Sequence, residues 1–244
     1  MIKKLIRQVR AWFFFKLVER KKYPSYTLIE KFRELVYMKE LLDDAGITTV
    51  IDVGANEGQF AHDLRRIGFK GKIISFEPGK AAFTILEANA SGDPQWTCYQ
   101  YALGQQEGVM KFYIPTDTKL SSLLPSDQVG EGGTTEEVQV KRLDEVIKTA
   151  AVTGVKERYF LKLDTQGFDL EVFKGSTALL DEVEGLLSEL SVLPLYQGMP
   201  PYKEALTIYE NAGFTIRSLS IVARNWHKEV VELNAIMQRI VVKK

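Results

Sequence analysis

The chain has few of the residues that build disulfide frameworks and zinc sites. Its 244 residues include one cysteine, Cys98, and two histidines. A single cysteine excludes an internal disulfide, and one cysteine with two histidines cannot assemble a Cys/His zinc site. We therefore expect a reducing compartment, the cytoplasm, as the location of the protein.

Long hydrophobic runs and an excess of charge of either sign are also missing. The longest unbroken apolar run near either end, Ala11–Phe15, is far shorter than the roughly 18 residues that a membrane-spanning helix needs. Lys plus Arg and Asp plus Glu both total 32, so the formal net charge is zero. Because the whole molecule has no positive field, we expect no nucleic-acid partner. The 45% of hydrophobic residues are nevertheless enough to bury a sizeable core.

Positive charge is concentrated in the first 22 residues. This segment carries eight Lys and Arg residues against Glu19 alone, a local charge of +7, and its apolar residues recur at spacings of three and four. The pattern predicts a basic amphipathic helix, and Lys16 interrupts the apolar run that a signal peptide requires. Such a helix can lie on an anionic membrane, which would place the protein at the inner face of that membrane. The alternative is that it packs on the domain or on a second subunit of a homo-oligomer.

The rest of the chain alternates between short β-branched segments and amphipathic helices. Residues 27–46 show helical spacing, and Thr49–Val53 has the composition of a buried parallel strand. The continuing βαβαβ pattern predicts a doubly wound α/β sheet in one domain, 47–244, which follows a helical extension, 1–46. Further strands are expected at 72–77, 96–101, 109–114, 138–141, 159–164, 185–191, 214–219 and 233–242, with helices at 60–67, 81–89, 143–150, 170–180 and 202–211.

Residues 115–137 form a long polar stretch without strong periodicity. Structureless loops of this length are unusual inside compact domains. The stretch is either a substrate lid or a disordered surface insertion. Its glycines at 130, 132 and 133 are not followed by the Lys-Ser/Thr of a phosphate-binding loop, so a phosphate-binding role is not expected.

A glycine-containing segment, 52–58, lies where the first strand gives way to the first helix. Gly54 and Gly58 allow the backbone to approach a ligand closely, but the segment is neither Gly-x-Gly-x-x-Gly nor a Walker loop. The missing phosphate anchors disfavour a dehydrogenase. Glu77 closes the second strand, where a carboxylate can accept hydrogen bonds from both ribose hydroxyls. We expect an adenosine-type site here, against the alternative of a generic turn followed by a solvated glutamate.

Five short segments carry further information, namely Asp52–Phe60, Phe76–Pro78, Tyr101–Gly104, Arg142–Asp144 and Lys162–Asp169. Their order and spacing resemble the successive motifs of the FkbM-type methyltransferases, which use S-adenosylmethionine and often methylate hydroxyls of sugars, glycans or natural products. The resemblance covers roughly residues 47–242. It implies a class I, Rossmann-like fold, with a mostly parallel seven-stranded sheet and an antiparallel last strand.

The resemblance also implies roles for individual residues. Glu77 would hold the ribose of S-adenosylmethionine, and Asp52 would orient the glycine loop or reach the ammonium group of the cofactor. Gln166 and Asp169 depart from the family, which often has an acidic residue at the first position and commonly Glu at the second. The other implied cofactor contacts are Gly54, Asn56 and Gly58 along the methionine part, and Ala102 and Leu103 beside the adenine.

A hydroxyl acceptor needs help in losing its proton, because it is a poor nucleophile at neutral pH. Asp164, at the carboxyl end of the expected fourth strand, is the first candidate base, and Glu189 after the fifth strand is the second. His227 is a third candidate by its intrinsic pKa, and is equally consistent with a surface residue beside Trp226. Scattered carboxylates do not define a cation site, so we predict no metal.

The sequence therefore predicts an S-adenosylmethionine-dependent O-methyltransferase. Its expected acceptor is a hydroxyl of a saccharide, glycan or related metabolite. The alternative is a non-catalytic S-adenosylmethionine-binding or membrane-associated scaffold protein with the same fold.

Overall fold

A computed structural model of the chain describes residues 26–126, 133–150 and 157–239. The expected basic helix at 1–22 lies outside the described residues. The elements, in chain order, are α2 (Tyr26–Asp44), β1 (Thr49–Val53), α3 (Gln59–Arg66), β2 (Lys72–Phe76), α4 (Lys80–Ala90), β3 (Trp96–Tyr99), β4 (Ala102–Leu103), β5 (Gly108–Ile114), the 3-10 turn η1 (Thr118–Leu120), β6 (Thr134–Lys141), α5 (Leu143–Ala150), β7 (Tyr159–Leu163), α6 (Asp169–Lys174), the 3-10 helix η2 (Thr177–Glu182), β8 (Val183–Ser191), α7 (Tyr202–Asn211), β9 (Phe214–Arg224) and β10 (Val230–Arg239).

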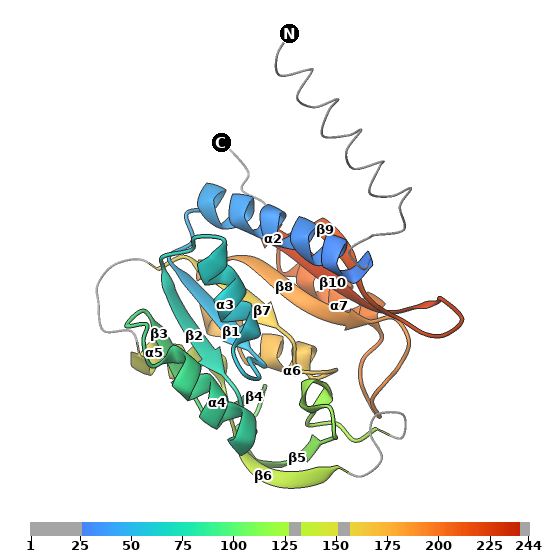
Figure 1. Cartoon of the computed structure of the whole chain (residues 1–244). Helices are drawn as coiled ribbons and strands as arrows, with labels where there is room; N and C mark the ends of the chain where they lie inside the picture. Colours follow the sequence, from blue (N-terminus) through green and yellow to red (C-terminus); the bar gives the residue numbers. More distant parts are fainter. Residues whose placement is uncertain (1–25, 127–132, 151–156, 240–244) are drawn as a thin grey trace, which may run out of the picture.

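Seven strands form a central sheet in the order β3-β2-β1-β7-β8-β10-β9 (Figure 1). The first five strands run parallel to one another, and β10 is antiparallel to both β8 and β9. The predicted doubly wound, mostly parallel sheet is thereby confirmed. The strand order reverses between β1 and β7, and open α/β sheets bind ligands beside the carboxyl ends of strands at such a switch point.

The two strands at this switch point, β1 and β7, are buried along their whole length. Parallel strands covered on both faces are typically continuous apolar and β-branched runs, which explains most of their composition. Asp52 and Lys162 are the charged exceptions, and they are register partners on the two strands. Opposite charges persist in such an interior when they are paired with each other.

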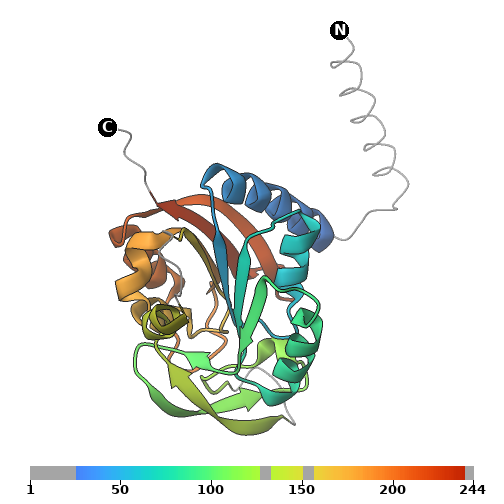
Figure 2. The ribbon, with the colours of Figure 1, turned by 90° about the vertical axis from the view of Figure 1, so that its left-hand side faces the viewer.

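Helices cover both faces of the sheet (Figure 2). On one face, α2, α3 and α4 pack on Val50, Phe160 and Ile236 of the strands. On the other face, α5, α6 and α7 pack on a second apolar cluster, in which the ring centroids of Phe173 and Tyr209 lie 4.7 Å apart. The side chains of the sheet therefore form two cores, one on each side.

Helix α2 belongs to the first of these cores. Met38, Leu41 and Leu42 are almost fully buried and pack with residues of β1, α3 and α4. The domain boundary that the sequence predicts at residue 46 falls between α2 and β1. In the structure, the part of the extension after Tyr26 therefore packs on the domain that follows it.

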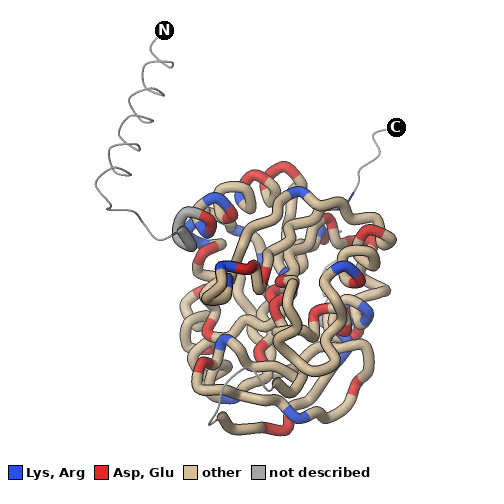
Figure 3. Tube along the Cα trace, turned by 90° about the vertical axis from the view of Figure 1, so that its right-hand side faces the viewer, with Lys and Arg blue, Asp and Glu red and all other residues tan. Residues whose placement is uncertain are grey.

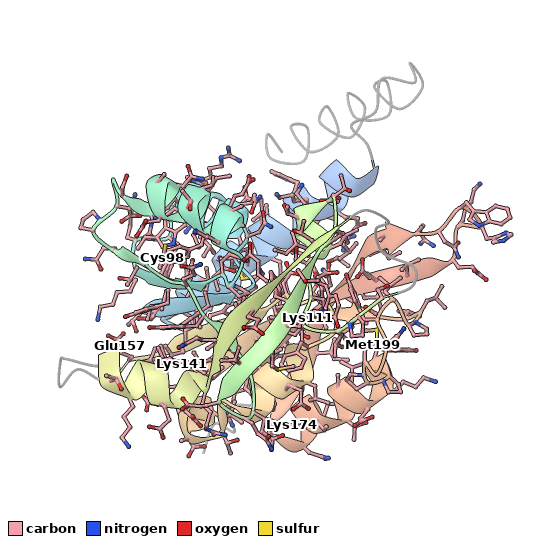
Figure 4. All side chains as sticks on the ribbon, turned by 90° about the horizontal axis from the view of Figure 1, so that it is seen from below. Cys98, Lys111, Lys141, Glu157, Lys174 and Met199 are labelled. Carbon is pink, nitrogen blue, oxygen red and sulfur yellow. The ribbon has the colours of Figure 1, made fainter. Side chains whose placement is uncertain are left out.

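A second sheet contains three strands in the order β4-β6-β5. It lies at the lower end of the molecule, where Figure 4 labels Lys111 of β5 and Lys141 of β6. The expected strands at 109–114 and 138–141 are present here, outside the main sheet. Two parts of the polar stretch 115–137 have regular structure, because η1 lies at Thr118–Leu120 and Thr134–Glu137 pair with β5. Residues 127–132 lie outside the described part.

The expected helix at 170–180 is divided in two. Helix α6 ends at Lys174, and the 3-10 helix η2 begins at Thr177. Gly175, which lies between them, packs closely on Gly104, the residue after β4. A Cβ added at Gly175 would lie 2.1 Å from the Gly104 carbonyl oxygen. A helical pattern in the sequence does not reveal this close backbone contact.

Charged residues of both signs are spread along the described trace (Figure 3). Within residues 26–126, 133–150 and 157–239, no helix is both long and apolar enough to cross a membrane. The amphipathic segment with the concentrated positive charge precedes these residues.

Gly54 allows the carboxyl ends of β1 and β7 to come together. Its φ is +72°, a left-handed conformation that favours glycine. A Cβ at this position would lie 1.8 Å from the backbone oxygen of Asp164, which follows β7. The loop after β1 can therefore lie against β7 only when residue 54 has no side chain.

Gly54→Ala should lower the free energy of unfolding by about 2 kcal/mol or more, because it adds backbone strain and a contact with a carbonyl that cannot move freely. Gly92→Ala is the matched control, since a Cβ at Gly92 meets nothing within 4 Å. Urea denaturation of both variants measures the difference. Equal effects at the two positions would contradict the close packing inferred at Gly54.

Candidate active site

A cavity of about 580 Å³ lies at the carboxyl ends of the central strands. Residues at or just beyond the ends of β1, β2, β7 and β8 form one part of its wall, and residues of α2, α3, η1, β9 and β10 complete it. Eight carboxylate and three lysine side chains line this cavity. The excess of negative charge favours ligands that carry positive charge or donate hydrogen bonds.

The loop after β1 forms the floor of one half of the cavity. The amides of Gly54 and Ala55 both donate to the carbonyl of Phe76, each at 3.0 Å, and thereby hold the loop on β2. The Asn56 amide donates to Glu77 Oε2 at 2.9 Å, and its side chain donates to the Thr118 carbonyl at 3.2 Å. Gly54 and Asn56 thus line the cavity, as expected, and Asn56 connects it to the polar stretch that follows β5.

Two residues of the same motif lie behind the cavity wall. Gly58 is the N-cap residue of α3, and a Cβ added there would lie 2.7 Å from the Trp96 ring and 2.9 Å from Leu86. Asp52 is fully buried and pairs with Lys162. Neither residue lines the cavity. Gly58 therefore serves the packing of α3, and Asp52 serves the orientation of the loop.

Glu77 is the carboxylate of this half of the cavity. Its Oε1 accepts from the Gly79 amide at 2.8 Å, while Oε2 accepts from the Asn56 amide. Burial raises the pKa of Glu77 to about 7, although these two amide donors favour the ionised form. Four further residues add an apolar part to the cavity wall. They are Ala102 and Leu103, which are both buried, together with Phe76 and Tyr101.

Lys162 is the central cation of the site. Its ammonium nitrogen lies 3.0 Å from Asp52 Oδ1 and 3.2 Å from Asp164 Oδ2, and donates to the Gly54 carbonyl at 2.9 Å. Burial lowers the pKa of Lys162, but the charges of Asp164 and Asp52 outweigh it, so the pKa lies above that of an ordinary lysine. The ammonium group therefore stays protonated and holds β1, the glycine loop and Asp164 together.

Two of the three candidate bases, Asp164 and Glu189, line the cavity and contact the same side chain. The Gln166 side-chain amide donates to Glu189 Oε2 at 2.5 Å and to Asp164 Oδ1 at 3.3 Å, and Gln166 Oε1 accepts from the Tyr196 hydroxyl at 2.7 Å. Burial raises the pKa of Glu189 well above its ordinary value, and the charges of Asp164 and Glu232 raise it further. A neutral amide at position 166 thus bridges two carboxylates without adding a third charge.

Asp169 supports the backbone that carries Asp164. Its Oδ1 accepts from the Thr165 amide at 2.7 Å, and its Oδ2 accepts from the Ser188 hydroxyl at 2.9 Å. Burial raises the pKa of Asp169 to about 6, although the two Thr165 donors lower it. Asp169 does not line the cavity, so the shorter side chain at this position serves the loop and not the ligand surface.

The structure does not bring His227 to the cavity. This histidine lies in the turn between β9 and β10, where it is exposed and its ring lies 3.3 Å from that of Trp226. Trp226 is 85% exposed, and neither residue lines the cavity. Of the two interpretations of His227, candidate base or surface residue beside Trp226, the structure fits the second, because His227 lies in the turn of the long β9–β10 hairpin (Figure 1).

The sequence interpretation missed an acidic wall opposite the glycine loop. Glu34 of α2 accepts from Ser220 Oγ at 2.6 Å and from Asn234 Nδ2 at 2.9 Å. Glu232 lies two residues before Asn234 in β10, and both line the cavity. The alternation of β10 could have placed Glu232 and Asn234 on one face, but only the folded chain shows which face meets α2.

None of the described residues forms a cluster of three or more His, Cys, Asp or Glu side chains with the arrangement of a metal site. Asp144, one of the scattered carboxylates, pairs with Arg142 at 2.6 Å and lies outside the cavity. Asp164 and Glu189 are held by Lys162 and Gln166, as described above.

The chain is similar to known methyltransferases. The family model described as the methyltransferase FkbM domain matches residues 52–216. Methyltransferase sdnD of Sordaria araneosa is 26% identical over 79% of this chain and 86% of its own length. The 2-O-methyltransferase NoeI of Sinorhizobium fredii (strain NBRC 101917 / NGR234) is 22% identical over 72% of this chain and 75% of its own.

A solved structure shares the fold at low sequence identity. The bifunctional kinase–methyltransferase WbdD is 15% identical, with a TM-score of 0.50 over 86% of this chain and 40% of that protein. The family match covers more than half of the chain and includes the glycine loop, Glu77, Asp164 and Glu189. The chain therefore belongs to the FkbM methyltransferase family.

Proposed function

We propose that the protein transfers a methyl group from S-adenosylmethionine to a hydroxyl of a saccharide or a related metabolite. The observation that carries this proposal is the arrangement of one cavity. A carboxylate suited to ribose, Glu77, lies in one half, and two carboxylates that can take a hydroxyl proton, Asp164 and Glu189, lie in the other.

The residues in the first half fit the cofactor. Glu77 is ready to accept hydrogen bonds from ribose hydroxyls, while Ala102 and Leu103 offer apolar contact to an adenine ring. Gly54 and Asn56 leave room for the methionine part beside the loop. The excess of cavity carboxylates stabilises a ligand with a positively charged sulfur. When bound, S-adenosylmethionine supplies an electrophilic methyl group on that sulfur.

Asp164 is the proposed base. Its side chain is about one-third exposed, at 36%, so it can reach a ligand, while the ion pair with Lys162 fixes its position. A carboxylate held in this way would accept the proton of the acceptor hydroxyl as its oxygen takes the methyl group, with S-adenosylhomocysteine as the leaving group. Glu189, which shares the Gln166 amide with Asp164, orients the acceptor by accepting a second hydrogen bond.

Transfer to oxygen and a saccharide acceptor are supported by two features. A relative, NoeI, carries the name 2-O-methyltransferase. The second half of the cavity is also rich in carboxylate, amide and hydroxyl groups that suit a polyhydroxylated ligand. The competing proposal is a non-catalytic S-adenosylmethionine-binding scaffold, which would bind the cofactor and never consume it.

The basic amphipathic segment, 1–22, supports a further proposal, that the protein docks on an anionic membrane. Its +7 charge suits anionic headgroups, and its aromatic residues suit the boundary with the acyl chains. Docking of this kind would bring the cavity close to lipid-linked acceptors.

S-adenosylhomocysteine should bind more weakly as the pH is lowered from 8 to 6, by about tenfold, because Glu77, with a pKa of about 7, must be ionised to accept two hydroxyls. Calorimetric titration of the full chain at each pH measures this. Glu77→Gln should bind weakly throughout and lose most of the pH dependence. An unchanged pH profile in that variant would remove Glu77 from the ribose site.

Asp164→Asn should lower kcat by about 100-fold or more while S-adenosylhomocysteine still binds, because the variant loses the base but keeps the cofactor half. The rate is measured as transfer of a labelled methyl group to a saccharide panel. Asp181→Asn, at an exposed position, is the control and should retain full activity. A normal rate in Asp164→Asn with a loss in Glu189→Gln would transfer the role to Glu189.

Liposome flotation tests the membrane proposal. The full chain should float with vesicles that contain phosphatidylserine and not with neutral vesicles, and deletion of residues 1–22 should abolish flotation. Flotation that survives the deletion, or that does not depend on anionic lipid, would contradict the proposal.

A further inference from the structure

We propose that Glu232 forms an acceptor subsite for a protonated amine, so that the acceptor is a hydroxylated compound with a free ammonium group, such as an amino sugar. This inference rests on the proposed function, because the subsite lies in the same cavity as Asp164. It names a chemical class of acceptor that the family membership does not give.

The first observation is the lack of a partner for Glu232. Its residue is only 6% exposed, and Oε1 is fully buried with no hydrogen-bond partner among the described residues. A buried carboxylate without a donor is unfavourable, and such groups in native proteins call for a ligand or another explanation. Glu232 lines the cavity, so a positively charged ligand there can balance the charge of this carboxylate.

The other cavity carboxylates differ from Glu232 in this respect. Every one of them accepts a hydrogen bond or pairs with a cation that the structure shows. They are Glu30 with Arg33, Glu34 with Ser220 and Asn234, Asp63 with Lys31, Glu77 with two amides, Asp117 with the Lys119 amide, Asp164 with Lys162, and Glu189 with Gln166.

The second observation is the position of Glu232 in the sheet. β10 is the third strand from β1 in the order β1-β7-β8-β10, so Glu232 lies roughly 14 Å from the glycine loop across the strands. Asn234, on the same face of β10, is the register partner of Glu189. Glu232 therefore lies beside Glu189 and Asn234, two strands beyond Asp164 and farther from the loop around Gly54 than the proposed base is.

The third observation is the charge of this half. Burial raises the pKa of Glu189, with a further rise from the charges of Asp164 and Glu232, and burial with the charges of Asp164 and Asp169 raises the pKa of Glu232 to about 7. The cation nearby, Lys162, is already held by Asp52 and Asp164. A hydroxyl would supply a donor only, whereas an ammonium group supplies donors and also the missing positive charge.

The full chain loaded with S-adenosylhomocysteine provides the test. Calorimetric titration with glucosamine and with N-acetylglucosamine compares a protonated amine with its neutral amide. We expect glucosamine to bind about tenfold more tightly. Glu232→Gln should remove this difference, and Glu137→Gln, the same change at an exposed position on β6, should preserve it.

Equal binding of the two sugars, no binding of either, or a preference that survives in Glu232→Gln would overturn the subsite. A chain that does not bind S-adenosylhomocysteine would contradict the proposed function instead, and the two sugars are then compared on the ligand-free protein. Urea denaturation provides a second readout. Glu232→Gln should leave stability unchanged or higher, and a clear loss would show that Glu232 has a structural role.

Discussion

The buried ammonium group of Lys162 is the interaction on which the site depends. It lies between two carboxylates, Asp52 on β1 and Asp164 after β7, and it also holds the loop at Gly54. Removal of the ammonium group would leave Asp52 buried without its cation, which is strongly unfavourable. Beyond Asp52, the polar contacts continue through Ser75 to the Trp96 ring nitrogen, so one row of side chains crosses four adjacent strands. The strand register and the position of the proposed base are therefore set by the same contacts.

The cavity gathers its carboxylates into two groups with different surroundings. Glu77 accepts from two backbone amides that belong to the chain segments on either side of it, so its position is fixed before a ligand arrives. Asp164 and Glu189 are linked by a single side-chain amide, which leaves their remaining oxygen lone pairs for an acceptor. Gln166 contacts both carboxylates of this second group, and Asp169 lies behind the cavity wall next to it. Each has a defined structural role there, as a bridge between carboxylates and as a support for the Thr165 backbone.

Much of the fold and of the cavity wall around Glu77 could be predicted from the sequence. The central strands are short, β-branched and apolar, and the glycine loop and Glu77 follow two of them at the positions where a switch point binds ligands. Predictions were less accurate where backbone contacts between distant segments decide the structure. The close packing of Gly175 on Gly104 divides the expected helix at 170–180, and pairing with β5 turns the end of a polar stretch into β6.

The alternation of strands and helices, the family motifs and the carboxylates at the ends of neighbouring strands can be identified from the sequence, because these depend on local periodicity and short spacings. Other features follow from the folded chain alone: Asp52 and Gly58 lie behind the cavity, His227 lies away from it, and Glu34 and Glu232 complete its wall. The physical reason is that α2 and β10 are separated by almost the whole chain. Their side chains meet only after β10 has entered the sheet antiparallel to β8 and α2 has packed on the same face.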